Sequence, residues 1–442
     1  MKSWVKNYLY SFLNLERKIK FDYKKSLKLE RFQHFLNLAG NPQLYLGNVI
    51  QIAGTKGKGS VAYFLGYILK ECGFRVGVFT SPHLEELNER ISLFYKDKVS
   101  FISFKELYDI ICEYKGVLEK CRFHPKWGQL SFFEVMTFMA FVYFVKRKVD
   151  FVVLEAGLGA RLDSTNVCKS NVVCITRIDY DHQQKLGYRL SDITYEKAGF
   201  IKGDQFVVSI RQRYSVSRLL RKICRQRNCV WLEENKDFFC IDKKHTPYSQ
   251  IFKFVDEGCI IDNIKIKMLG IHQIENAGVS IKTSLIFKEG YPEITVENIK
   301  KGLEKTYIPA RMELFRLNVP VICDCAHNPS SCMYLVEGIK RHFPLKKVVL
   351  VFGASLDKDV KKMASILQEI SSKVILTGLK ENPRLFNPNL LKSFFSIPAE
   401  VVEEPLEAVD LALNICKRDQ MVLVCGSMFI TGKIRAYLKK NV

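Results

Sequence analysis

The stretch "IQIAGTKGKGSVAYFLGYIL", from Ile50 to Leu69, predicts a strand, a glycine-rich loop and a helix in direct succession. The apolar residues that follow Ser60 recur at helical spacing, and a glycine-rich turn that leads into a helix N-terminus offers backbone N–H groups to an anion. The general phosphate-loop pattern places lysine directly before the hydroxyl residue. Here Gly59 separates Lys58 from Ser60, and a second lysine, Lys56, lies two positions before Lys58. Three glycines and two lysines at the end of a strand favour a phosphate site over a plain strand-to-helix turn.

We expect this loop to contact the phosphates of a nucleotide. The predicted contact residues are Gly54, Thr55, Lys56, Gly57, Lys58, Gly59 and Ser60. Lys58 would neutralise the β- and γ-phosphates, and Ser60, taken as the first helical residue, would contact a metal ion or the β-phosphate. Two interpretations of Lys56 stay open: it adds a contact to the triphosphate, or it faces solvent.

The composition indicates a globular protein that attracts anions. The chain has 442 residues, 48% of them hydrophobic, which predicts two domains or three. Its 68 Lys+Arg and 46 Asp+Glu give a net charge of +22, which favours nucleotides, polycarboxylates or nucleic acid as partners. The lysines are scattered, however, and no nucleic-acid-binding motif is present. We therefore expect a solvated basic surface that binds no nucleic acid.

Cysteine usage and hydropathy indicate a cytoplasmic protein. None of the fourteen cysteines belongs to a C-x-x-C pair, and many lie in apolar runs, as reduced thiols do. The N-terminus has neither the apolar core nor the cleavage site of a signal peptide. The most apolar long stretch, Ser131 to Val145, is interrupted by Glu134 and Thr137 and is too short to cross a bilayer. It predicts a buried helix, and no membrane partner is expected.

Short β-rich runs alternate with helical periods, which predicts an α/β protein with mostly parallel sheets. The expected strands of the first series are "NVIQIAG", "RVGVFT", "VDFVVLEAG" and "NVVCITRI". The more irregular segment 204–268 predicts a smaller antiparallel element appended to that sheet. A second α/β series, from "VPVICDCAHN" to "MVLVCGS", follows "TYIPARMEL". Because Pro309 interrupts the pattern, we place the domain boundary near 306–312 and divide the chain into 1–307 and 308–442.

Three polar residues come at the ends of strands in the first series: Ser81 after "VGVFT", Glu155 in "FVVLEAG" and His182 after "CITRIDYD". Each has an ordinary structural explanation, as a helix cap, a surface carboxylate and a core imidazole respectively. The carboxyl ends of parallel strands meet at one edge of a sheet, however, where ligands bind. Mg²⁺ takes few protein ligands and completes its shell with substrate phosphate. Together these residues predict a Mg²⁺ site beside the phosphate loop.

A series of motifs in a fixed order resembles one protein family. The motifs are "AGTKGKGS", "FTSPHL", "LEAGLGARLDSTN", "DHQQKLG", "EKAGFIK", "GIHQIENA", "PARME", "DCAHNP" and "CGSMFITGKIR". The series is similar to that of the folylpolyglutamate synthases and dihydrofolate synthases, ATP-dependent amide-bond ligases of the Mur ligase superfamily. It extends from about Leu29 to Arg435. The resemblance implies an N-terminal P-loop-type ATPase domain with a mostly parallel sheet and a C-terminal Rossmann-like ligase domain.

The resemblance also implies roles for individual residues. In this family the phosphate loop itself places a glycine between lysine and serine. The implied metal ligands are Ser81, Glu155 and His182, and the implied ATP contacts outside the loop are Asn276, Arg311 and Asp324. The implied catalytic group comprises Lys58, Lys197, Asp324 and His327. Lys197 matches a lysine that is typically carbamylated in this family, which turns it into an anionic metal ligand, and Asp324 and His327 match positions that serve nucleotide and amino acid.

The function that the resemblance implies is ligation of L-glutamate to folate or dihydropteroate, at the expense of ATP and through an acyl phosphate, by a monomer. Four residues depart from the family pattern: Lys56 in place of asparagine, Ala160 and Cys325 in place of glycine, and Asp179 in place of a small residue. None of these changes removes a phosphate, metal or catalytic group. Ala160 and Asp179 lie near the expected pterin pocket, so they bear on substrate preference.

Two other functions are compatible with the phosphate loop. The first is that of another Mur-type amino-acid ligase, which the folate-branch motifs "GLGARLDSTN" and "SPHLEELNERI" disfavour. The second is a non-catalytic nucleotide-binding module that the net charge attracts to nucleic acid. Five residues speak against that second function: Lys58, Glu155, His182, Lys197 and Asp324.

Overall fold

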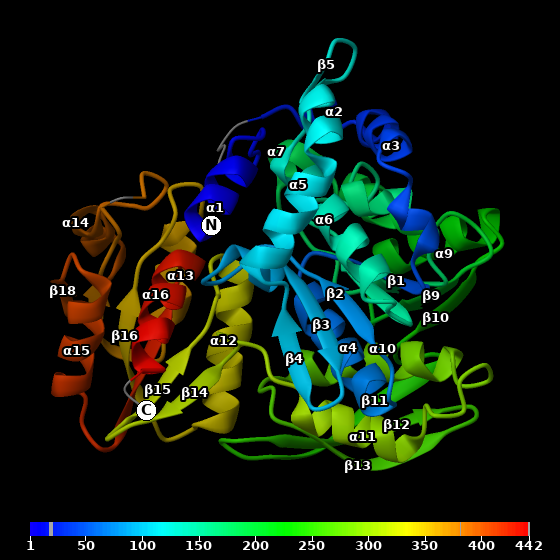
Figure 1. The fold of residues 1–442 in the computed structure, drawn as a ribbon. Coiled ribbons are helices and arrows are strands. Elements are labelled where there is room, and N and C mark those ends of the chain that lie inside the picture. The colour runs from blue at the N-terminus through cyan, green and yellow to red at the C-terminus, as the bar shows by residue number, and fades with distance from the viewer. Residues whose placement is uncertain (17–20, 381, 441–442) are drawn as a thin grey trace. The chain divides into compact units, whose positions relative to one another are not determined.

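The computed structural model describes residues 1–16, 21–380 and 382–440, and the chain divides into two compact units (Figure 1). Unit 1 comprises Met1–Ile241, Phe252–Ile264 and Ile274–Thr306, and unit 2 comprises Asp242–Ile251, Lys265–Gln273 and Tyr307–Val442. Two short segments from the middle of the chain therefore group with the C-terminal part. All fourteen cysteines lie within the described residues and carry free thiols.

Unit 1 is built on an eight-stranded sheet in the order β10-β9-β8-β1-β7-β2-β3-β4. Its strands are β1 (Asn48–Ala53), β2 (Val76–Phe79), β3 (Ile91–Tyr95), β4 (Lys98–Phe101), β7 (Phe151–Glu155), β8 (Val172–Ile175), β9 (Phe206–Ser209) and β10 (Val230–Glu233). All pairs from β10 to β2 are parallel. β3 and β4 add an antiparallel hairpin at the β2 edge, which the sequence pattern did not reveal. The predicted mostly parallel α/β architecture is confirmed.

The register of β1 decides what surrounds the phosphate loop. Ile52 of β1 pairs with Glu155 of β7, and Ala53 pairs with Ile175 of β8. Both neighbouring strands therefore end level with β1. The loop after Ala53 begins beside Glu155 on one side and beside Thr176, the residue after β8, on the other.

Helices cover the sheet of unit 1 (Figure 1). They are α1 (Lys2–Tyr10), α2 (Tyr23–Ser26), α3 (Leu29–Leu38), α4 (Lys58–Glu71), α5 (Phe104–Lys120), α6 (Phe132–Lys146), α7 (Gln183–Leu186), α8 (Leu190–Lys197), α9 (Tyr214–Gln226) and α11 (Val296–Lys305). The 3-10 turns of this unit are at Pro42–Tyr45, Leu87–Arg90, Ser164–Val167 and Ala198–Phe200, and a short hairpin is formed by two strands of two residues each, β5 (Phe123–His124) and β6 (Gly128–Gln129). α10 (Ile271–Ile286) begins in the Lys265–Gln273 segment and continues into unit 1. α11 approaches α4 so closely that a Cβ on Gly302 would lie 2.5 Å from the Cα of Ile68.

The most apolar stretch of the chain forms α6. Its residues from Phe132 to Phe144 are almost all buried, and Ser131 caps the helix by accepting the N–H of Glu134. The expectation of a buried helix here is met. Among the helices of the described ranges, none is both long and apolar enough to cross a membrane.

The segment 204–268 differs from the prediction of one appended antiparallel element. Its first part extends the parallel sheet, because α9 lies between β9 and β10 and supplies the crossover that parallel strands need. Its second part is a separate three-stranded sheet of β11 (Phe238–His245), β12 (Gln250–Asp256) and β13 (Ile260–Ile266). The turns that join these three strands are so short that the pairing is antiparallel. Periodicity alone did not separate the two parts.

Unit 2 contains a six-stranded sheet in the order β14-β15-β19-β16-β17-β18. Its strands are β14 (Glu313–Arg316), β15 (Pro320–Cys323), β16 (Lys347–Phe352), β17 (Ser371–Leu376), β18 (Ala399–Val401) and β19 (Gln420–Cys425). Its helices are α12 (Pro329–His342), α13 (Val360–Leu367), α14 (Pro388–Leu391), α15 (Pro405–Ile415) and α16 (Met428–Leu438), with a 3-10 turn at Lys392–Phe394. All strand pairs are parallel except β14 with β15. This is the predicted second α/β series, with β14 as an additional edge strand.

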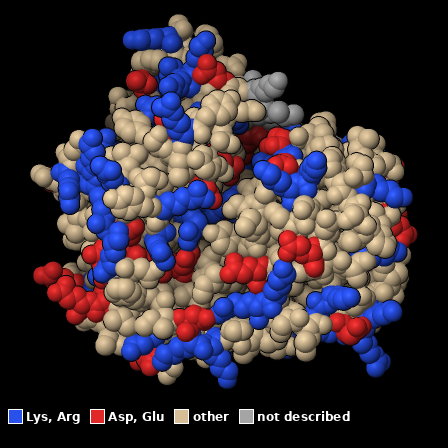
Figure 2. All heavy atoms as spheres, turned by 180° about the vertical axis from the view of Figure 1, so that it is seen from behind, with Lys and Arg blue, Asp and Glu red and all other residues tan. Residues whose placement is uncertain are grey.

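Basic side chains are widely distributed on the face of the molecule that Figure 2 shows. In Figure 2 the Lys and Arg side chains are scattered over the face shown, with Asp and Glu side chains among them. The net charge of +22 is therefore not gathered into a single patch on this face.

Candidate functional site

Gly54 and Gly57 shape the loop that follows β1. Gly54 has a φ of +146°, and a Cβ there would lie 1.9 Å from Thr176 Oγ1. Gly57 has a φ of +91°, and its Cβ would lie 2.5 Å from Asn276 Oδ1 of α10. The positive φ values favour glycine at both positions, and neither position has room for a side chain. Asn276 therefore lies directly against the phosphate loop.

Thr55 ties the loop to the segment after β8. Its N–H donates to the Arg177 carbonyl oxygen at 2.7 Å. Its hydroxyl accepts the N–H of Asp179 at 3.0 Å and donates to the Asp179 carbonyl oxygen at 3.0 Å. These bonds hold the phosphate loop and residues 177–179 side by side.

α4 begins at Lys58, two residues before the position predicted from the sequence, so Ser60 is the third helical residue and not the first. The reason is Gly57, whose left-handed backbone turns the chain into the helix and whose carbonyl accepts the first helical bond, from Val61 at 3.0 Å. The N–H groups of Lys58, Gly59 and Ser60 precede that bond and have no partner within the helix. They form an anion-binding helix N-terminus.

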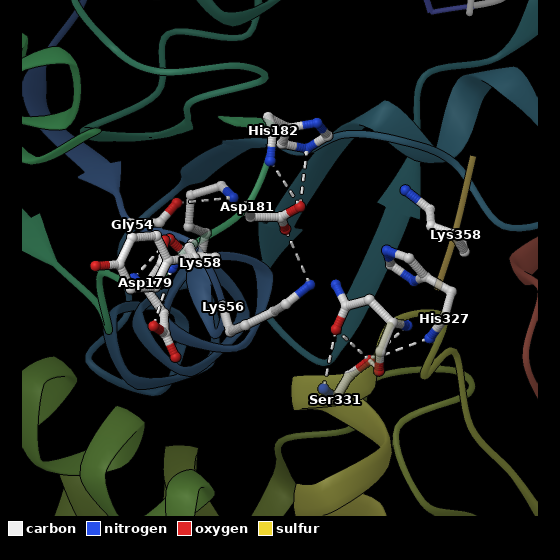
Figure 3. Close-up of polar contacts among 12 residues, drawn as sticks. Gly54, Lys56, Lys58, Asp179, Asp181, His182, His327, Ser331 and Lys358 are labelled. Carbon is white, nitrogen blue, oxygen red and sulfur yellow. Dashed lines mark hydrogen bonds and ion pairs between the residues drawn. The ribbon is translucent and has the colours of Figure 1, made fainter. Parts of the chain in front are cut away.

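Two lysine ammonium groups converge on the carbonyl oxygen of Gly54; Figure 3 labels Gly54 and one of the two lysines, Lys58. Lys58 Nζ donates to it at 3.3 Å, and Nζ of Lys197, the last residue of α8, donates at 2.8 Å. Lys197 is buried, and burial together with the charge of Lys58 lowers the pKa of Lys197 to about 7, although Asp181 acts in the opposite direction. Like charges held this close favour an anion between or beside them. A phosphate chain would supply one.

Glu155, at the end of β7, lies between Ser81 and Lys58. Its Oε2 accepts the backbone N–H of Ser81 at 3.1 Å, and its Oε1 lies 3.9 Å from Lys58 Nζ. The Glu155 side chain is 8% exposed. The structure thus brings Ser81, Glu155 and Lys58, three of the predicted site residues, into one cluster.

The donors around Glu155 fit a hard divalent cation that keeps most of its water. Over the described ranges, no group of three or more His, Cys, Asp and Glu residues is placed to hold a metal ion by itself. Mg²⁺ is typically bound by one or two carboxylates plus substrate phosphate. A buried carboxylate beside a serine and next to an anion-binding loop is a donor set of this kind.

His182, the third predicted metal ligand, lies on the turn between β8 and α7 and has a left-handed backbone with a φ of 50°. Its side chain is 42% exposed. The carboxylate of Asp181 accepts the His182 N–H through Oδ1 at 3.0 Å, and Oδ1 also lies 3.9 Å from His182 Nε2. The other oxygen, Oδ2, lies 3.3 Å from Lys56 Nζ (Figure 3). Asp181 therefore connects His182 to the phosphate loop.

In unit 2, Arg311 and Asp324 lie near the carboxyl end of β15. Asp324 accepts two backbone N–H groups, from Ala326 through Oδ1 at 2.7 Å and from Met312 through Oδ2 at 2.8 Å. Burial raises the pKa of the Asp324 carboxyl, while the Arg311 guanidinium and the two N–H groups act to lower it. The carboxylate holds the loop that carries Arg311 against the end of β15.

His327 lies at the start of α12. Its Nδ1 is 2.8 Å from the Cys325 carbonyl oxygen, so the neutral ring carries its proton on Nδ1. The His327 N–H donates to Ser331 Oγ at 3.1 Å, and the Asn328 side chain caps α12 by accepting the Ser331 N–H at 3.0 Å (Figure 3). The cap fixes the orientation of the helix N-terminus beside His327.

Sequence reasoning missed two residues that organise these clusters. Asp181 joins Lys56 to His182, and Ser331 receives both His327 and Asn328 N–H groups. A signal for Asp181 was present, because metal-ligating histidines commonly pair with a carboxylate and Asp181 directly precedes the expected ligand His182. Ser331 had the spacing of a helix-capping residue after "HNP".

Comparisons with known proteins agree with the geometry. The model of the Mur ligase glutamate ligase domain matches residues 310–428. A dihydrofolate synthase/folylpolyglutamate synthase of Bacillus subtilis is 30% identical over 429 residues, which is 96% of this chain and 97% of that protein. The crystal structure of the Thermotoga maritima folylpolyglutamate synthase is similar with a TM-score of 0.85 and 32% identity, covering 100% of this chain and 97% of that one.

A further solved structure, of a folylpolyglutamate synthase complexed with AMPPCP and folate, is similar with a TM-score of 0.83 and 27% identity and covers 99% of both chains. These similarities extend over both units, and they agree with the motif resemblance. The chain belongs to the folylpolyglutamate synthase/dihydrofolate synthase family.

Proposed function

We propose that the protein is an ATP-dependent ligase that joins L-glutamate to the carboxylate of dihydropteroate, of a reduced folate, or of both. The observation that carries the proposal is the convergence of Lys58 and Lys197 on Gly54, at the N-terminus of α4 and one strand away from the buried Glu155. A cationic helix N-terminus beside a buried carboxylate suits a triphosphate with a divalent cation. Membership of the family supports the choice of acceptor and amino acid.

The proposed reaction has two steps. A carboxylate oxygen of the acceptor attacks the γ-phosphorus of ATP, the bond to the β–γ bridging oxygen breaks, and ADP leaves an acyl phosphate behind. The α-amine of glutamate then attacks the acyl carbon, phosphate departs and the amine gives up a proton, which leaves an amide. In such a reaction the protein contributes position and charge neutralisation, with no side-chain nucleophile.

Lys58 and the first N–H groups of α4 would bind the phosphates. Charge builds on the γ-phosphoryl oxygens as its bond to ADP breaks, and an ammonium held in place beforehand stabilises that charge without reorganisation. The hydrogen bond from Lys58 to Gly54 and its approach to Glu155 keep the ammonium near the loop. Asn276, packed against Gly57, and Arg311 would complete the ATP contacts.

Ser81, Glu155 and His182 would hold Mg²⁺, which when bound offsets charge on the β- and γ-phosphates. Lys197 would join them as a carbamate. Since its pKa is lowered to about 7, its amine is largely neutral above that pH and can attack CO₂, losing one proton to water and becoming an anion. The carbamate anion would face the ammonium of Lys58 and be attracted to it, whereas the neutral amine of Lys197 gains no such attraction.

We assign the ATP-binding domain to residues 1–307 and the C-terminal ligase domain, which would contact both glutamate and nucleotide, to residues 308–442. Asp324 and His327 would serve nucleotide and glutamate from the carboxyl end of β15. The proposal includes a cytoplasmic location and a monomeric state, and sedimentation velocity at micromolar concentration would test the latter.

The experiment that tests the function uses purified protein with ATP, Mg²⁺ and L-glutamate, offered dihydropteroate and tetrahydrofolate in separate reactions. Glutamate-dependent release of ADP with one or both acceptors is expected, together with an acceptor heavier by one glutamate. The acceptor that triggers release distinguishes a dihydrofolate synthase, a folylpolyglutamate synthase and a bifunctional enzyme. ADP release with a murein precursor and not with either folate-type acceptor would instead indicate another Mur-type ligase.

The nucleic-acid alternative has its own measurement. Binding of DNA and RNA would be titrated against salt, since phosphate-backbone contacts weaken steeply as salt rises. We expect only weak association at low salt. Nanomolar affinity with a steep salt dependence, in a protein that releases no ADP, would contradict the ligase proposal.

A further inference from the structure

Lys56 has a defined partner in the structure, Asp181, which directly precedes His182 on the turn after β8. Its ammonium lies 3.3 Å from Asp181 Oδ2, with the two side chains 23% and 20% exposed. Asp181 Oδ1 accepts the backbone N–H of His182 at 3.0 Å. We propose that Lys56 is a positioning residue that, through Asp181, holds His182 and its turn against the phosphate loop. The inference rests on the proposed function in one respect, the role of His182 as a metal ligand.

The turn that carries His182 needs such support. His182 has a left-handed backbone, which residues other than glycine adopt rarely and which the surroundings must hold in place. The hydrogen bond from its N–H to Asp181 is one restraint. It works only while the Asp181 carboxylate keeps its orientation, and the ion pair with Lys56 supplies that orientation (Figure 3).

Backbone hydrogen bonds hold the two segments that carry Lys56 and Asp181 close to each other. Lys56 forms an isolated antiparallel bridge with Arg177, its N–H lying 3.4 Å from the Arg177 carbonyl oxygen. Thr55 is bonded to Asp179 on the same side. Lys56 and Asp181 thus extend from two segments that are already fastened together, so the pair costs less side-chain entropy than a pair between mobile surface groups. Partial burial also reduces its screening by salt.

The competing role for Lys56 is direct contact with the triphosphate. The two roles differ in what they depend on. A direct contact acts on the nucleotide itself and does not require Asp181. A positioning role acts through Asp181 on His182, so it alters the affinity for the divalent cation and disappears once Asp181 is neutral.

The test is a double-mutant cycle of Lys56→Gln, Asp181→Asn and the double variant of the full-length protein. Affinity for Mn²⁺, as a paramagnetic probe for the cation site, is measured by electron paramagnetic resonance at saturating AMPPCP. Affinity for AMPPCP is measured by calorimetry with EDTA present. Lys56→Arg, which keeps the charge, and Lys169→Gln, which removes an exposed lysine of unit 1, serve as controls, and thermal unfolding verifies that each variant is folded.

If Lys56 positions His182, each single variant weakens Mn²⁺ binding by about fivefold. The double variant should also lose about fivefold in Mn²⁺ affinity, and not the product of the two single losses, because the effects of two groups in one interaction are not additive. The Mn²⁺ affinities of Lys56→Arg and Lys169→Gln stay within about twofold of that of wild type, since surface charge changes act weakly. The AMPPCP affinity of Lys56→Gln in EDTA also stays within about twofold of the wild-type value.

The inference would be overturned if the loss of Mn²⁺ affinity in the double variant equalled the product of the losses in the two single variants. An equal loss of AMPPCP affinity with and without Mn²⁺ in Lys56→Gln would also overturn it and would establish a direct phosphate contact. A wild-type protein that binds neither AMPPCP nor Mn²⁺ would overturn the proposed function and the inference with it.

Discussion

Lys58 combines two positions that matter for phosphate chemistry: it is the first residue of α4, and its ammonium is bonded to the loop carbonyl of Gly54. Lys58→Ala removes the charge that would neutralise the γ-phosphoryl group. We expect glutamate-dependent ADP release to fall by about a hundredfold or more, the scale of losing one preorganised charge-stabilising group. The fold should persist, with a circular dichroism spectrum like that of wild type. Lys169→Ala, an exposed lysine in the same unit, is the matched control. Unchanged turnover in Lys58→Ala would contradict the phosphate-loop assignment.

The proposed carbamylation of Lys197 can be tested through its dependence on pH and on bicarbonate. Because burial and Lys58 lower its pKa to about 7, the amine loses its proton as the pH rises through about 7, well below the range of an ordinary lysine. Wild-type activity in CO₂-free buffer should therefore be restored by bicarbonate more effectively at pH 8 than at pH 6. Lys197→Ala should lose activity by about a hundredfold and regain part of it with acetate or another short carboxylate.

The chemical observation for Lys197 is a carbamate signal in ¹³C NMR after addition of labelled bicarbonate, present in wild type and absent from Lys197→Ala. If Lys197→Ala turns over like wild type, the carbamate proposal is wrong.

Among the secondary-structure elements, the helix α12 makes specific polar contacts near both of its ends. Its N-terminus carries the Asn328 cap beside His327, and its last residue, His342, is buried. His342 Nε2 accepts the N–H of Gly270 at 3.2 Å, and its Nδ1 lies 2.6 Å from the Thr246 carbonyl oxygen. A neutral imidazole with its proton on Nδ1 satisfies both contacts. His342 therefore anchors the two mid-chain segments of unit 2 to α12.

His342→Ala should destabilise the protein by about 2–4 kcal/mol, because it leaves the buried Gly270 N–H and the Thr246 carbonyl without this partner. The measurement is the midpoint of urea unfolding at pH 7.5. His245→Ala removes the exposed histidine whose ring lies edge-on to His342, so it is the control and should change stability by less than about 0.5 kcal/mol. Equal stability of His342→Ala and wild type would contradict the anchoring role.

The same residue makes stability depend on pH. Burial lowers the pKa of His342, Arg341 and His245 act in the same direction, and the Thr246 carbonyl and Asp242 oppose them. In the unfolded chain a histidine takes up its proton near about pH 6.5. The unfolded state then binds more protons than the native state, so stability falls as the pH drops below about 6.5 towards the lowered native pKa. The slope should be smaller in His342→Ala and retained in His245→Ala.

At the scale of the whole molecule, the net charge of +22 bears on encounter with substrates, because ATP and glutamylated folates are anions. On the face shown in Figure 2, the basic side chains lie among acidic ones and are not gathered into a single patch.

We expect kcat/KM for the acceptor to fall severalfold between about 50 and 300 mM NaCl, since the Debye length shrinks from about 14 Å to below about 6 Å in that range. A triglutamylated acceptor should show a steeper decrease than a monoglutamylated one, and kcat should change by less than about twofold because the bound complex is not affected by long-range steering. Equal slopes for the two acceptors would show that net charge plays no part in their capture.

Residue patterns anticipated much of this molecule and failed at identifiable places. The strand, loop and helix around Lys58 were predictable because glycine spacing and helical periodicity are properties of neighbouring residues. The β3–β4 hairpin, the split of segment 204–268 and the edge strand β14 were not, since short strands carry little periodic signal. The start of α4 at Lys58 was missed because it depends on the left-handed Gly57.

By itself, the sequence determined the α/β class, the phosphate loop and the family, since local spacing and the order of motifs encode them. Only the tertiary structure decided which partners each group has. β1 lies between β7 and β8 in a register that aligns their ends, and this alone places Glu155 and residues 176–182 beside the loop. Lys56 and Asp181, 125 positions apart, meet because of that register. Such contacts arise from packing between distant segments, and no periodicity along the chain records them.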